Sequence, residues 1–477
     1  MSIEYLGLSE INGPLIALEG VKNAAYEEIV ELTVEGKEKK LGRIVEVYDD
    51  KAVIQVFAGS ENMSLHNTHT KLTGHPMEIS LSPKMLGRTF DGLGRPIDRL
   101  GRIVSDIKRN VNGLPLNPVT REYPRNYIRT GISAIDGLTT LIRGQKLPIF
   151  SGNGLPHNEL AAQIVRQASL GDAEADKNFA IVFAAMGVKY DVADFFRRTF
   201  QESGASDHVV MFLNLANDPV VERLITPKVA LTVAEYLAFD CNMHVLVILT
   251  DMTSFAEAMR EVSSSKGEIP SRKGYPGYLY SELATIYERA GIVEGVNGSV
   301  TQIPILTMPN DDITHPIPDL TGYITEGQIV LDRNLHGQSV YPPINILPSL
   351  SRLMKDGIGE GFTRADHQDV ANQLFSCYAK VGDARALASV IGEDELSPLD
   401  KKYLEFGKAF EIEFLGQRAD ENRTIETTLD IGWHLLRMLP REELDRIDTK
   451  VLDVYYNKEE SELPSEEDST DGPSNAE

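Results

Sequence analysis

The sequence contains few cysteines, fewer basic than acidic residues, and no long apolar run. Its two cysteines, Cys241 and Cys377, stand far apart, so they provide neither a disulfide framework nor the ligand spacing of a metal site. No stretch reaches the roughly 18 apolar residues of a membrane span. The opening stretch MSIEYLGLSEINGPL also lacks the basic segment and apolar run of an export signal. We therefore expect a protein of the reducing cytoplasm without a metal centre.

Basic residues are outnumbered, with 47 Lys and Arg against 71 Asp and Glu, which gives a formal net charge of -24. A surface that binds nucleic acid neutralises phosphates with clustered Lys and Arg. The charge balance therefore argues against a nucleic-acid partner, although it does not exclude a local basic site. Part of the negative charge lies in residues 457–477, which contain no aromatic residue. We expect this segment to be a disordered, solvated tail.

Length and patterning predict three folded parts before that tail. At roughly 100–200 residues per domain, the chain has room for two to four domains. Residues 1–75 carry short apolar runs separated by turns, which is the pattern of a small β-barrel. Within residues 76–355, nearly continuous apolar runs alternate with helical segments, which indicates a parallel α/β sheet buried on both faces. Residues 356–456 have the pattern of helices, so we expect a helical third domain.

The segment LPIFSGNGLPHNELAAQIVRQ (147–167) runs an apolar strand through a glycine-containing turn into an amphipathic helix, as a phosphate-binding loop does. A functional loop reads GxxxxGK[ST]: its backbone N–H groups cradle the phosphates, its lysine reaches them and its hydroxyl holds Mg²⁺. Ser151, Pro156, His157 and Asn158 take those four positions. Proline offers no N–H, histidine is shorter than lysine and mostly neutral, and asparagine is a weak Mg²⁺ ligand. From the residues alone, a plain strand-to-helix turn is the simplest interpretation.

Two further strand ends bear on the chemistry. The apolar run HVLVILTD ends in Asp251, which delivers a carboxylate to the sheet edge, as the second Mg²⁺-binding element of nucleotide hydrolases does. Where a carboxylate that polarises the attacking water is needed, the chain has Val188, which cannot act as a base. The helix after the loop is predicted over 158–170, with Leu160, Ile164 and Ala168 on one face.

Five long stretches carry a resemblance to a known family: IRTGISAIDGLTTLIRGQKLPIFSGNGLPHNE, KVALTVAEYLAF, GYPGYLYSELATIYERAG, DDITHPIPDLTGYITEGQI and YPPINILPSLSRL. With them, nearly the whole chain up to Tyr456 resembles the B subunit of V-type and archaeal-type rotary ATPases. The resemblance implies a β-barrel, an α/β core of the P-loop NTPase (RecA-like) type, and a C-terminal helical domain. This build agrees with the division of the chain given above.

The resemblance also implies a non-catalytic, regulatory role. Such a protein alternates with catalytic A subunits in a hexameric ring, which works with central rotor stalk and peripheral stalk subunits and touches the membrane only indirectly. ATP or ADP with Mg²⁺ binds at the A–B interfaces, where A supplies the phosphate loop and the general base. The missing lysine at position 157 and the missing carboxylate at 188 are then expected, and this chain alone should bind no nucleotide tightly. The ring couples ATP synthesis or hydrolysis to proton or sodium transport.

Specific residues follow from the resemblance. Arg352, in the stretch SLSR, is expected to act as an arginine finger in the site of the neighbouring A subunit, because a guanidinium is always charged and can bind two phosphate oxygens at once. Tyr341 would stack on an adenine ring, or it packs against the prolines that follow it. The chain's own degenerate pocket, which should bind nucleotide weakly or not at all, would comprise Ser151, Gly152, Gly154, His157, Asn158 and Asp251.

Two segments leave the interpretation open. The acidic stretch 392–400 resembles the part that faces the rotor, but a solvated turn explains it equally well. The family commonly has GRRGYPGY where this chain has SRKGYPGY, so Ser271 and Lys273 alter an interface loop, and the two-pronged geometry of an arginine is lost at position 273.

Two other functions compete with this interpretation. A hexameric motor acting on nucleic acid would need an intact phosphate loop and a basic channel, and the sequence offers neither. A purely structural ring component without nucleotide contact would have no use for Arg352. The sequence does not indicate whether synthesis or hydrolysis dominates, or which ion is carried.

Overall fold

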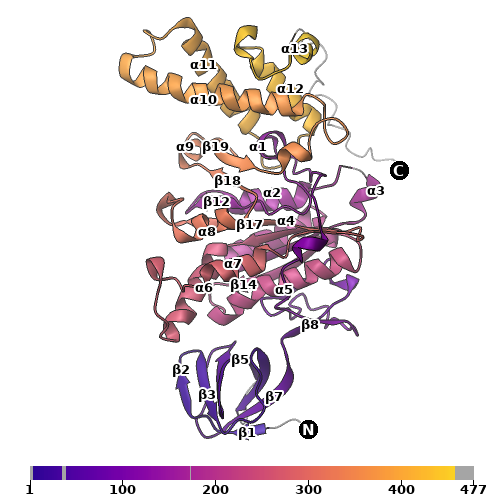
Figure 1. Ribbon diagram of the computed structural model, residues 1–477, viewed down its shortest axis with the longest axis vertical. Helices are drawn as coiled ribbons and strands as arrows, with labels where there is room; N and C mark the ends of the chain where they lie inside the picture. The colour runs from indigo at the N-terminus through magenta and orange to yellow at the C-terminus, as the bar shows by residue number, and fades with distance from the viewer. Residues whose placement is uncertain (1–3, 35–38, 172, 457–477) are drawn as a thin grey trace, which may run out of the picture.

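The computed structural model describes residues 4–34, 39–171 and 173–456. Its three parts follow one another along the long axis, with the N-terminal strands at one end, the α/β core in the middle and the last helices at the other end (Figure 1). The predicted acidic tail, 457–477, lies outside the described residues. Within the described residues, no helix is long and apolar enough to cross a membrane.

The N-terminal part is an antiparallel sheet that curls around its own core. Its alternating residues turn apolar side chains inward, and Ile16, Val30, Ile44 and Ile54 are almost completely buried there. The strand order is β1-β7-β4-β5-β6-β3-β2, with the bounds β1 Glu4–Leu6, β2 Glu10–Asn12, β3 Leu15–Glu19, β4 Glu28–Val34, β5 Lys40–Tyr48, β6 Lys51–Val56 and β7 Thr68–Pro76. The predicted β-barrel is confirmed.

The central part is a mostly parallel sheet in the order β19-β18-β12-β17-β15-β13-β14-β9. Neighbouring strands along this path are parallel except β18 and β19, which are antiparallel. The strands are β9 Thr89–Asp91, β12 Ile149–Gly152, β13 Phe179–Val188, β14 Val209–Leu215, β15 His244–Thr250, β17 Ser299–Met308, β18 Gly327–Leu331 and β19 Ile344–Ser351. Two short antiparallel pairs accompany it, β8 Glu78–Ser80 with β10 Lys108–Asn110, and β11 Arg121–Glu122 with β16 Gly291–Val293.

Helices cover both faces of this sheet, which explains the continuous apolar runs. Phe183 of β13 faces one core, which includes residues of α2 and α4, whereas its neighbours Val182 and Ala184 face the other, which includes residues of α5, α6 and α7. The helices are α1 Ser133–Leu138, α2 His157–Gln167, α3 Ala173–Asp176, α4 Tyr190–Glu202, α5 Val220–Phe239, α6 Met252–Ser265, α7 Leu279–Tyr287, α8 Pro316–Ile324 and α9 Arg333–Gly337.

The C-terminal part is helical, as predicted, and it shares a core with one face of the central sheet. Its elements are α10 His367–Ile391, α11 Pro398–Ala409, a π-helical turn Phe410–Leu415, α12 Ile425–Leu436 and α13 Thr449–Tyr455. Leu374, Phe410 and Trp433 belong to the same apolar cluster as Leu160 of α2. The central and helical parts are therefore packed together through a continuous core.

The predicted helix 158–170 differs from the observed one in its end. Helix α2 stops at Gln167, and Ala168 adopts an extended backbone. Ser169 exchanges two backbone hydrogen bonds with Arg129, each with an N···O distance of 3.0 Å. This pairing with a distant segment gives the backbone an alternative to the last helical turn.

Candidate functional site

The degenerate phosphate loop connects β12 to α2 and brings together the predicted residues Ser151, Gly152, Gly154, His157 and Asn158. Ser151 Oγ lies 3.0 Å from Nδ1 of His157, so both side chains are engaged with each other. Gly154 has a φ of 79°, which glycine adopts without strain. Helix α2 begins at His157 without a side-chain cap.

The backbone of this loop is poorly suited to cradle phosphates. The N–H of Leu155 donates to the carbonyl of Gly152 at 3.1 Å, and the N–H of His157 donates to the carbonyl of Leu155 at 2.9 Å. Pro156, between them, has no N–H to offer. A functional loop points such donors at the ligand. With these two donors bonded internally and no lysine present, the loop lacks several of the groups that a functional loop directs at phosphates.

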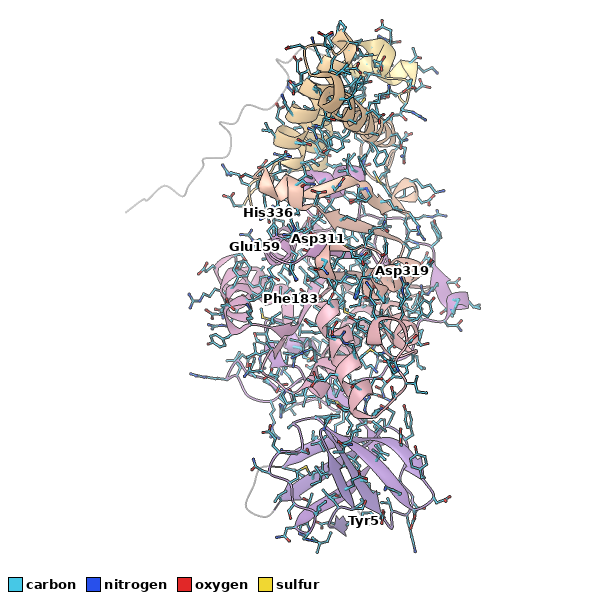
Figure 2. The ribbon with its side chains drawn as sticks, turned by 90° about the vertical axis from the view of Figure 1, so that its left-hand side faces the viewer. Tyr5, Glu159, Phe183, Asp311, Asp319 and His336 are labelled. Carbon is cyan, nitrogen blue, oxygen red and sulfur yellow. The ribbon has the colours of Figure 1, made fainter. Side chains whose placement is uncertain are left out.

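An ion pair lies against this loop, and no sequence pattern predicts it. Arg333 of α9 donates to both carboxylate oxygens of Asp311, at 2.7 and 2.9 Å, and to the carbonyl of Asn153 at 2.9 Å. The ion pair holds the pKa of Asp311 below its usual value, so the carboxylate is charged. A Cβ at Gly152 would collide with Asp311 Oδ1, so a larger residue here would displace the Asp311–Arg333 pair. Figure 2 shows Asp311 with Glu159 of α2 and His336 of α9 near it in that view.

Asp311 thus places a carboxylate beside the loop, and the ion pair with Arg333 offsets most of its charge. The backbone that presents it is unusual: Asn310 and Asp311 both have positive φ, 56° and 55°. Adjacent non-glycine residues in this region are uncommon and carry a cost in free energy. No local sequence signal identifies the pair, because Asp311 and Arg333 are 22 positions apart and meet only in the folded chain.

Asp251 lies at the end of β15, on the sheet edge that carries the loop. Its carboxylate caps α6 by accepting from the N–H of Thr253 at 2.7 Å. The hydroxyl of Thr307 donates to its other oxygen at 2.6 Å. Thr307 in β17 is the register partner of Ser151, which places Asp251 near the loop. Both oxygens of Asp251 are therefore already bound by protein donors.

Tyr341 precedes β19 and contacts α2, the helix that follows the loop. Its hydroxyl donates to Oε1 of Gln163 in α2 at 2.9 Å, and its carbonyl accepts from the N–H of Gln417 at 2.6 Å. Burial, followed by the nearby charge of Glu159, raises the pKa of the phenol. The ring is half-buried against α2 on the loop side of the molecule.

Arg352 is separate from these residues. It directly follows β19, which is antiparallel to β18, so it lies beside Gly327, where β18 begins, whereas the loop lies where the parallel strand β12 ends. Its backbone N–H donates to the carbonyl of Glu326 at 2.9 Å. Its side chain is exposed, and within the described part of the chain no hydrogen bond or ion pair engages the guanidinium. Arg352 and the chain's own loop therefore lie at opposite ends of the strands of the central sheet.

The two remaining segments are both at the surface. Lys273 forms an ion pair with Asp312 at 3.1 Å, and the N–H of Ser271 donates to the carbonyl of Tyr275 at 2.8 Å, so this turn is held within the chain. The acidic stretch 392–400 connects α10 to α11 and is mostly exposed, anchored by the buried Leu396.

Family models match three consecutive parts of the chain. Residues 8–74 match the beta-barrel domain of the ATP synthase alpha/beta family, residues 131–351 match its nucleotide-binding domain, and residues 356–456 match the C-terminal domain of V and A type ATP synthase.

Individual relatives are similar along almost their whole length. The V-type ATP synthase beta chain 2 of Clostridium tetani is 62% identical over 456 residues, which cover 96% of this chain and 99% of the relative. The B subunit of the A-type ATP synthase of Nitrosopumilus maritimus is 57% identical, with 96% and 99% covered. A solved structure of the ATP synthase subunit NeqB from Nanoarcheaum equitans has a TM-score of 0.72 at 40% identity and covers 90% of this chain and 100% of that one. The resemblance and the three-part fold predicted from the sequence are confirmed.

Proposed function

The chain belongs to the B (beta) subunit family of V- and A-type ATP synthases, and from that premise we propose that it is a non-catalytic, regulatory ring component that completes its neighbour's ATP site. In this proposal it alternates with catalytic A subunits in a hexamer, works with central and peripheral stalk subunits, and lies on the cytoplasmic side of the membrane. The ring couples ATP synthesis or hydrolysis to proton or sodium transport.

The observation that carries the proposal is the separation of Arg352 from the chain's own loop. An exposed guanidinium that no described residue engages, at the opposite end of the strands, cannot serve the loop of the same chain, but it is accessible to an adjacent molecule in a ring. There it would bind oxygens of the γ-phosphate of Mg²⁺-bound ATP and stabilise the charge that develops on them during transfer.

The chain's own loop also supports a non-catalytic role for this chain beside a catalytic A subunit. Two of its amides, those of Leu155 and His157, bond within the loop, it has no lysine, and Asp311, paired with Arg333, lies against it. We propose that Ser151, Gly152, Gly154, His157 and Asn158, with Asp251 and Tyr341, form at most a weak nucleotide pocket. Catalytic groups would then come from the A subunit. The domain boundaries proposed with this interpretation are residues 75 and 355.

The test is ATP hydrolysis by the chain alone, by its complex with a cognate A subunit, and by complexes that carry Arg352→Ala or Arg352→Lys. We expect no turnover by the chain alone, turnover by the complex, and a loss of roughly 10³-fold or more in kcat for Arg352→Ala. Lysine keeps the charge but not the two-pronged contact, so Arg352→Lys should recover only a small part of the rate.

The matched control is Arg102→Ala, which removes another exposed arginine. It should leave both turnover and assembly unchanged. Assembly of each complex is checked by size-exclusion chromatography with light scattering. An intact Arg352→Ala complex with full activity would overturn the finger and favour the alternative, a purely structural ring component. Hydrolysis by the chain alone would overturn the non-catalytic assignment.

A further inference from the structure

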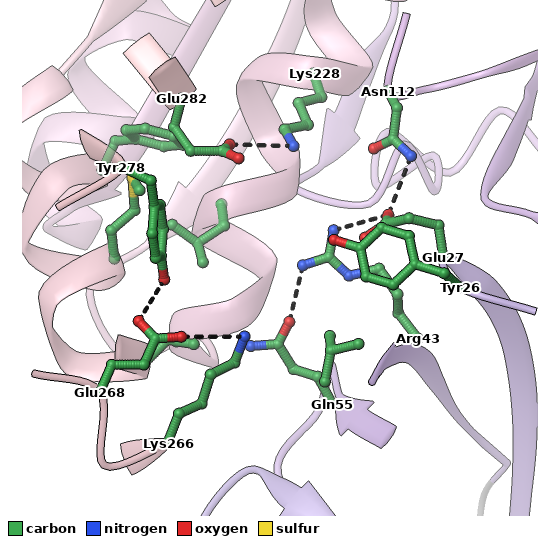
Figure 3. Close-up of a pocket in the computed structure, with 15 residues that line it drawn as sticks. Tyr26, Glu27, Arg43, Gln55, Asn112, Lys228, Lys266, Glu268, Tyr278 and Glu282 are labelled. Atoms are coloured by element: carbon green, nitrogen blue, oxygen red, sulfur yellow. Dashed lines mark hydrogen bonds and ion pairs between the residues drawn. The ribbon is translucent and has the colours of Figure 1, made fainter. Parts of the chain in front are cut away.

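A cavity of about 480 Å³ lies between the β-barrel and the central domain (Figure 3). Strands β5 and β6 line one side, and α5, α6 and the start of α7 line the other. Part of its wall is apolar and comes from Leu224, Phe255 and Met259. Its volume is within the range of about 300–1,000 Å³ that is usual for small-molecule sites. None of the residues that line the cavity belongs to the loop, and Arg352 is not among them.

The charges of this cavity are balanced. Arg43 pairs with Glu27 at 3.1 Å, Lys228 with Glu282 at 3.5 Å, and Lys266 with Glu268 at 3.8 Å. The last pair has the longest separation, and the other oxygen of Glu268 accepts from the hydroxyl of Tyr278 at 2.8 Å. Each of the three cations is thus paired with a carboxylate. The remaining polar group of interest is the amide of Gln55.

Gln55 of β6 is 1% exposed and has a hydrogen-bond donor without an acceptor. Its Oε1 accepts from Nη2 of Arg43 at 2.9 Å, which fixes the orientation of the amide. Nε2 therefore points the other way, and among the described residues it has no hydrogen-bond partner. Figure 3 shows this amide and the ammonium of Lys266 pointing toward one another across the cavity wall.

Two donors that face each other lack the acceptor that would join them. A buried, unpaired amide N–H costs free energy, and an adjacent ammonium adds an unfavourable dipole contact. An anionic oxygen placed between Gln55 and Lys266 would accept from both and form two hydrogen bonds, one of them charge-assisted. Since Lys266 is held only loosely, it can move to admit that oxygen.

We propose that this cavity binds a small organic monocarboxylate. Its carboxylate accepts from Nε2 of Gln55 and Nζ of Lys266, and its apolar body packs on Leu224, Phe255 and Met259. A single negative charge fits better than a phosphate dianion, because Arg43 and Lys228 are already paired with Glu27 and Glu282, and only the more loosely paired Lys266 is left to bind it. The ligand bridges the barrel and the central domain, so binding ties the two parts together.

The experiment measures binding of 3-phenylpropionate to the full-length chain by isothermal titration calorimetry. Two probes of similar shape accompany it: the uncharged 3-phenylpropionamide and the dianionic phenyl phosphate. Gln55→Glu keeps an acceptor for Arg43 but replaces the free donor with a negative charge. Lys266→Gln removes the ammonium at a partly buried position, where the side chain is 19% exposed, and Lys84→Gln, at an exposed lysine outside the cavity, is the matched control.

We expect saturable binding of the carboxylate that exceeds binding of both other probes. Gln55→Glu should weaken it by about tenfold or more, and Lys266→Gln by about threefold to tenfold, because each loses a charge-assisted or buried hydrogen bond. Lys84→Gln should bind as the unaltered chain does. Lys266→Gln keeps the test decisive if Gln55→Glu does not fold.

Three results would overturn the proposal. The first is no saturable binding of 3-phenylpropionate at about 10 mM, a concentration well above a millimolar dissociation constant. The second is equal or tighter binding of the amide or of phenyl phosphate, which would assign the cavity to a different ligand class. The third is unchanged affinity in a folded Lys266→Gln chain.

Discussion

At the scale of single residues, Glu222 of α5 has a buried carboxyl group whose negative charge is only weakly compensated by a cation. It is 5% exposed, and its nearest cation, Arg95, is 3.6 Å away. Burial, despite Arg95 and together with the repulsion of Asp91 and Asp218, raises the pKa of Glu222 from 4.5 to about 7. The folded chain therefore prefers the protonated form. The stabilising effect of that preference is fully present below pH 4.5 and is lost as the pH rises through 7.

Glu222→Gln should make stability less dependent on pH, since glutamine imitates the protonated carboxyl. Above pH 7 the variant should be more stable than the unaltered chain by about 2–3 kcal/mol, and near pH 4.5 the two should be equal. Urea unfolding between pH 4.5 and 8 measures the difference. Glu202→Gln, at an exposed site, should show no such trend. A constant difference at every pH would contradict the assignment.

The residue scale also shows what local sequence cannot predict. The missing lysine at His157 and the missing base at Val188 could be read directly, because each replaces a group whose chemistry is specific. The Asp311–Arg333 pair could not, because it depends on two left-handed residues and on a helix from another part of the chain.

At the scale of elements, Asp251 joins the start of α6 to the end of β17. Asp251→Ala removes the cap on Thr253 and leaves the hydroxyl of Thr307 without its acceptor. We expect a loss of about 1–3 kcal/mol in the free energy of unfolding, measured with urea in the absence of nucleotide. Asp383→Ala, at an exposed position of α10, should change it by less than about 0.5 kcal/mol. Unaltered stability in Asp251→Ala would argue that the carboxylate serves a ligand instead.

Elements were predictable where one physical signal dominates. The buried strand β13 is apolar throughout because helices cover both its faces, and the pattern identifies it. The end of α2 was not predictable, because the pairing of Ser169 with Arg129 outweighs the continued apolar face at Ala168. Tyr341 likewise meets Gln163 across 178 positions of sequence. Contacts over such separations set element ends and side-chain partners without leaving a local pattern.

At the scale of the whole molecule, the distribution of cores predicts how the chain unfolds. The central and C-terminal parts share one core, and Gln417 adds hydrogen bonds to Gly131 and Ser133. Most buried apolar residues of the barrel form a core of their own, and only a few, Ile29 and Phe57 among them, pack into the second cluster of the central part. We expect the central and C-terminal parts to unfold in one transition and the barrel in another.

Hydrogen exchange with mass spectrometry at increasing urea tests this prediction. Peptides from β12–β17 and from α10–α12 should lose protection together, whereas barrel peptides should lose it at a different urea concentration. Fluorescence of Trp433, the single tryptophan, should follow the first group. Separate transitions for Trp433 and the central sheet would contradict the shared core.

The antiparallel turn from β18 into β19 has a geometric consequence for assembly. It leaves the degenerate loop at one end of the parallel strands and Arg352, whose guanidinium no described residue engages, at the other, so the two sides of the molecule differ. Two such bodies related by a two-fold axis would present like sides to each other. If Arg352 reaches a neighbouring molecule, as proposed above, that contact is head-to-tail, and a head-to-tail series either closes into a ring or continues as an open filament. In a closed ring, the direction of β19 would then set the order in which the molecules face one another.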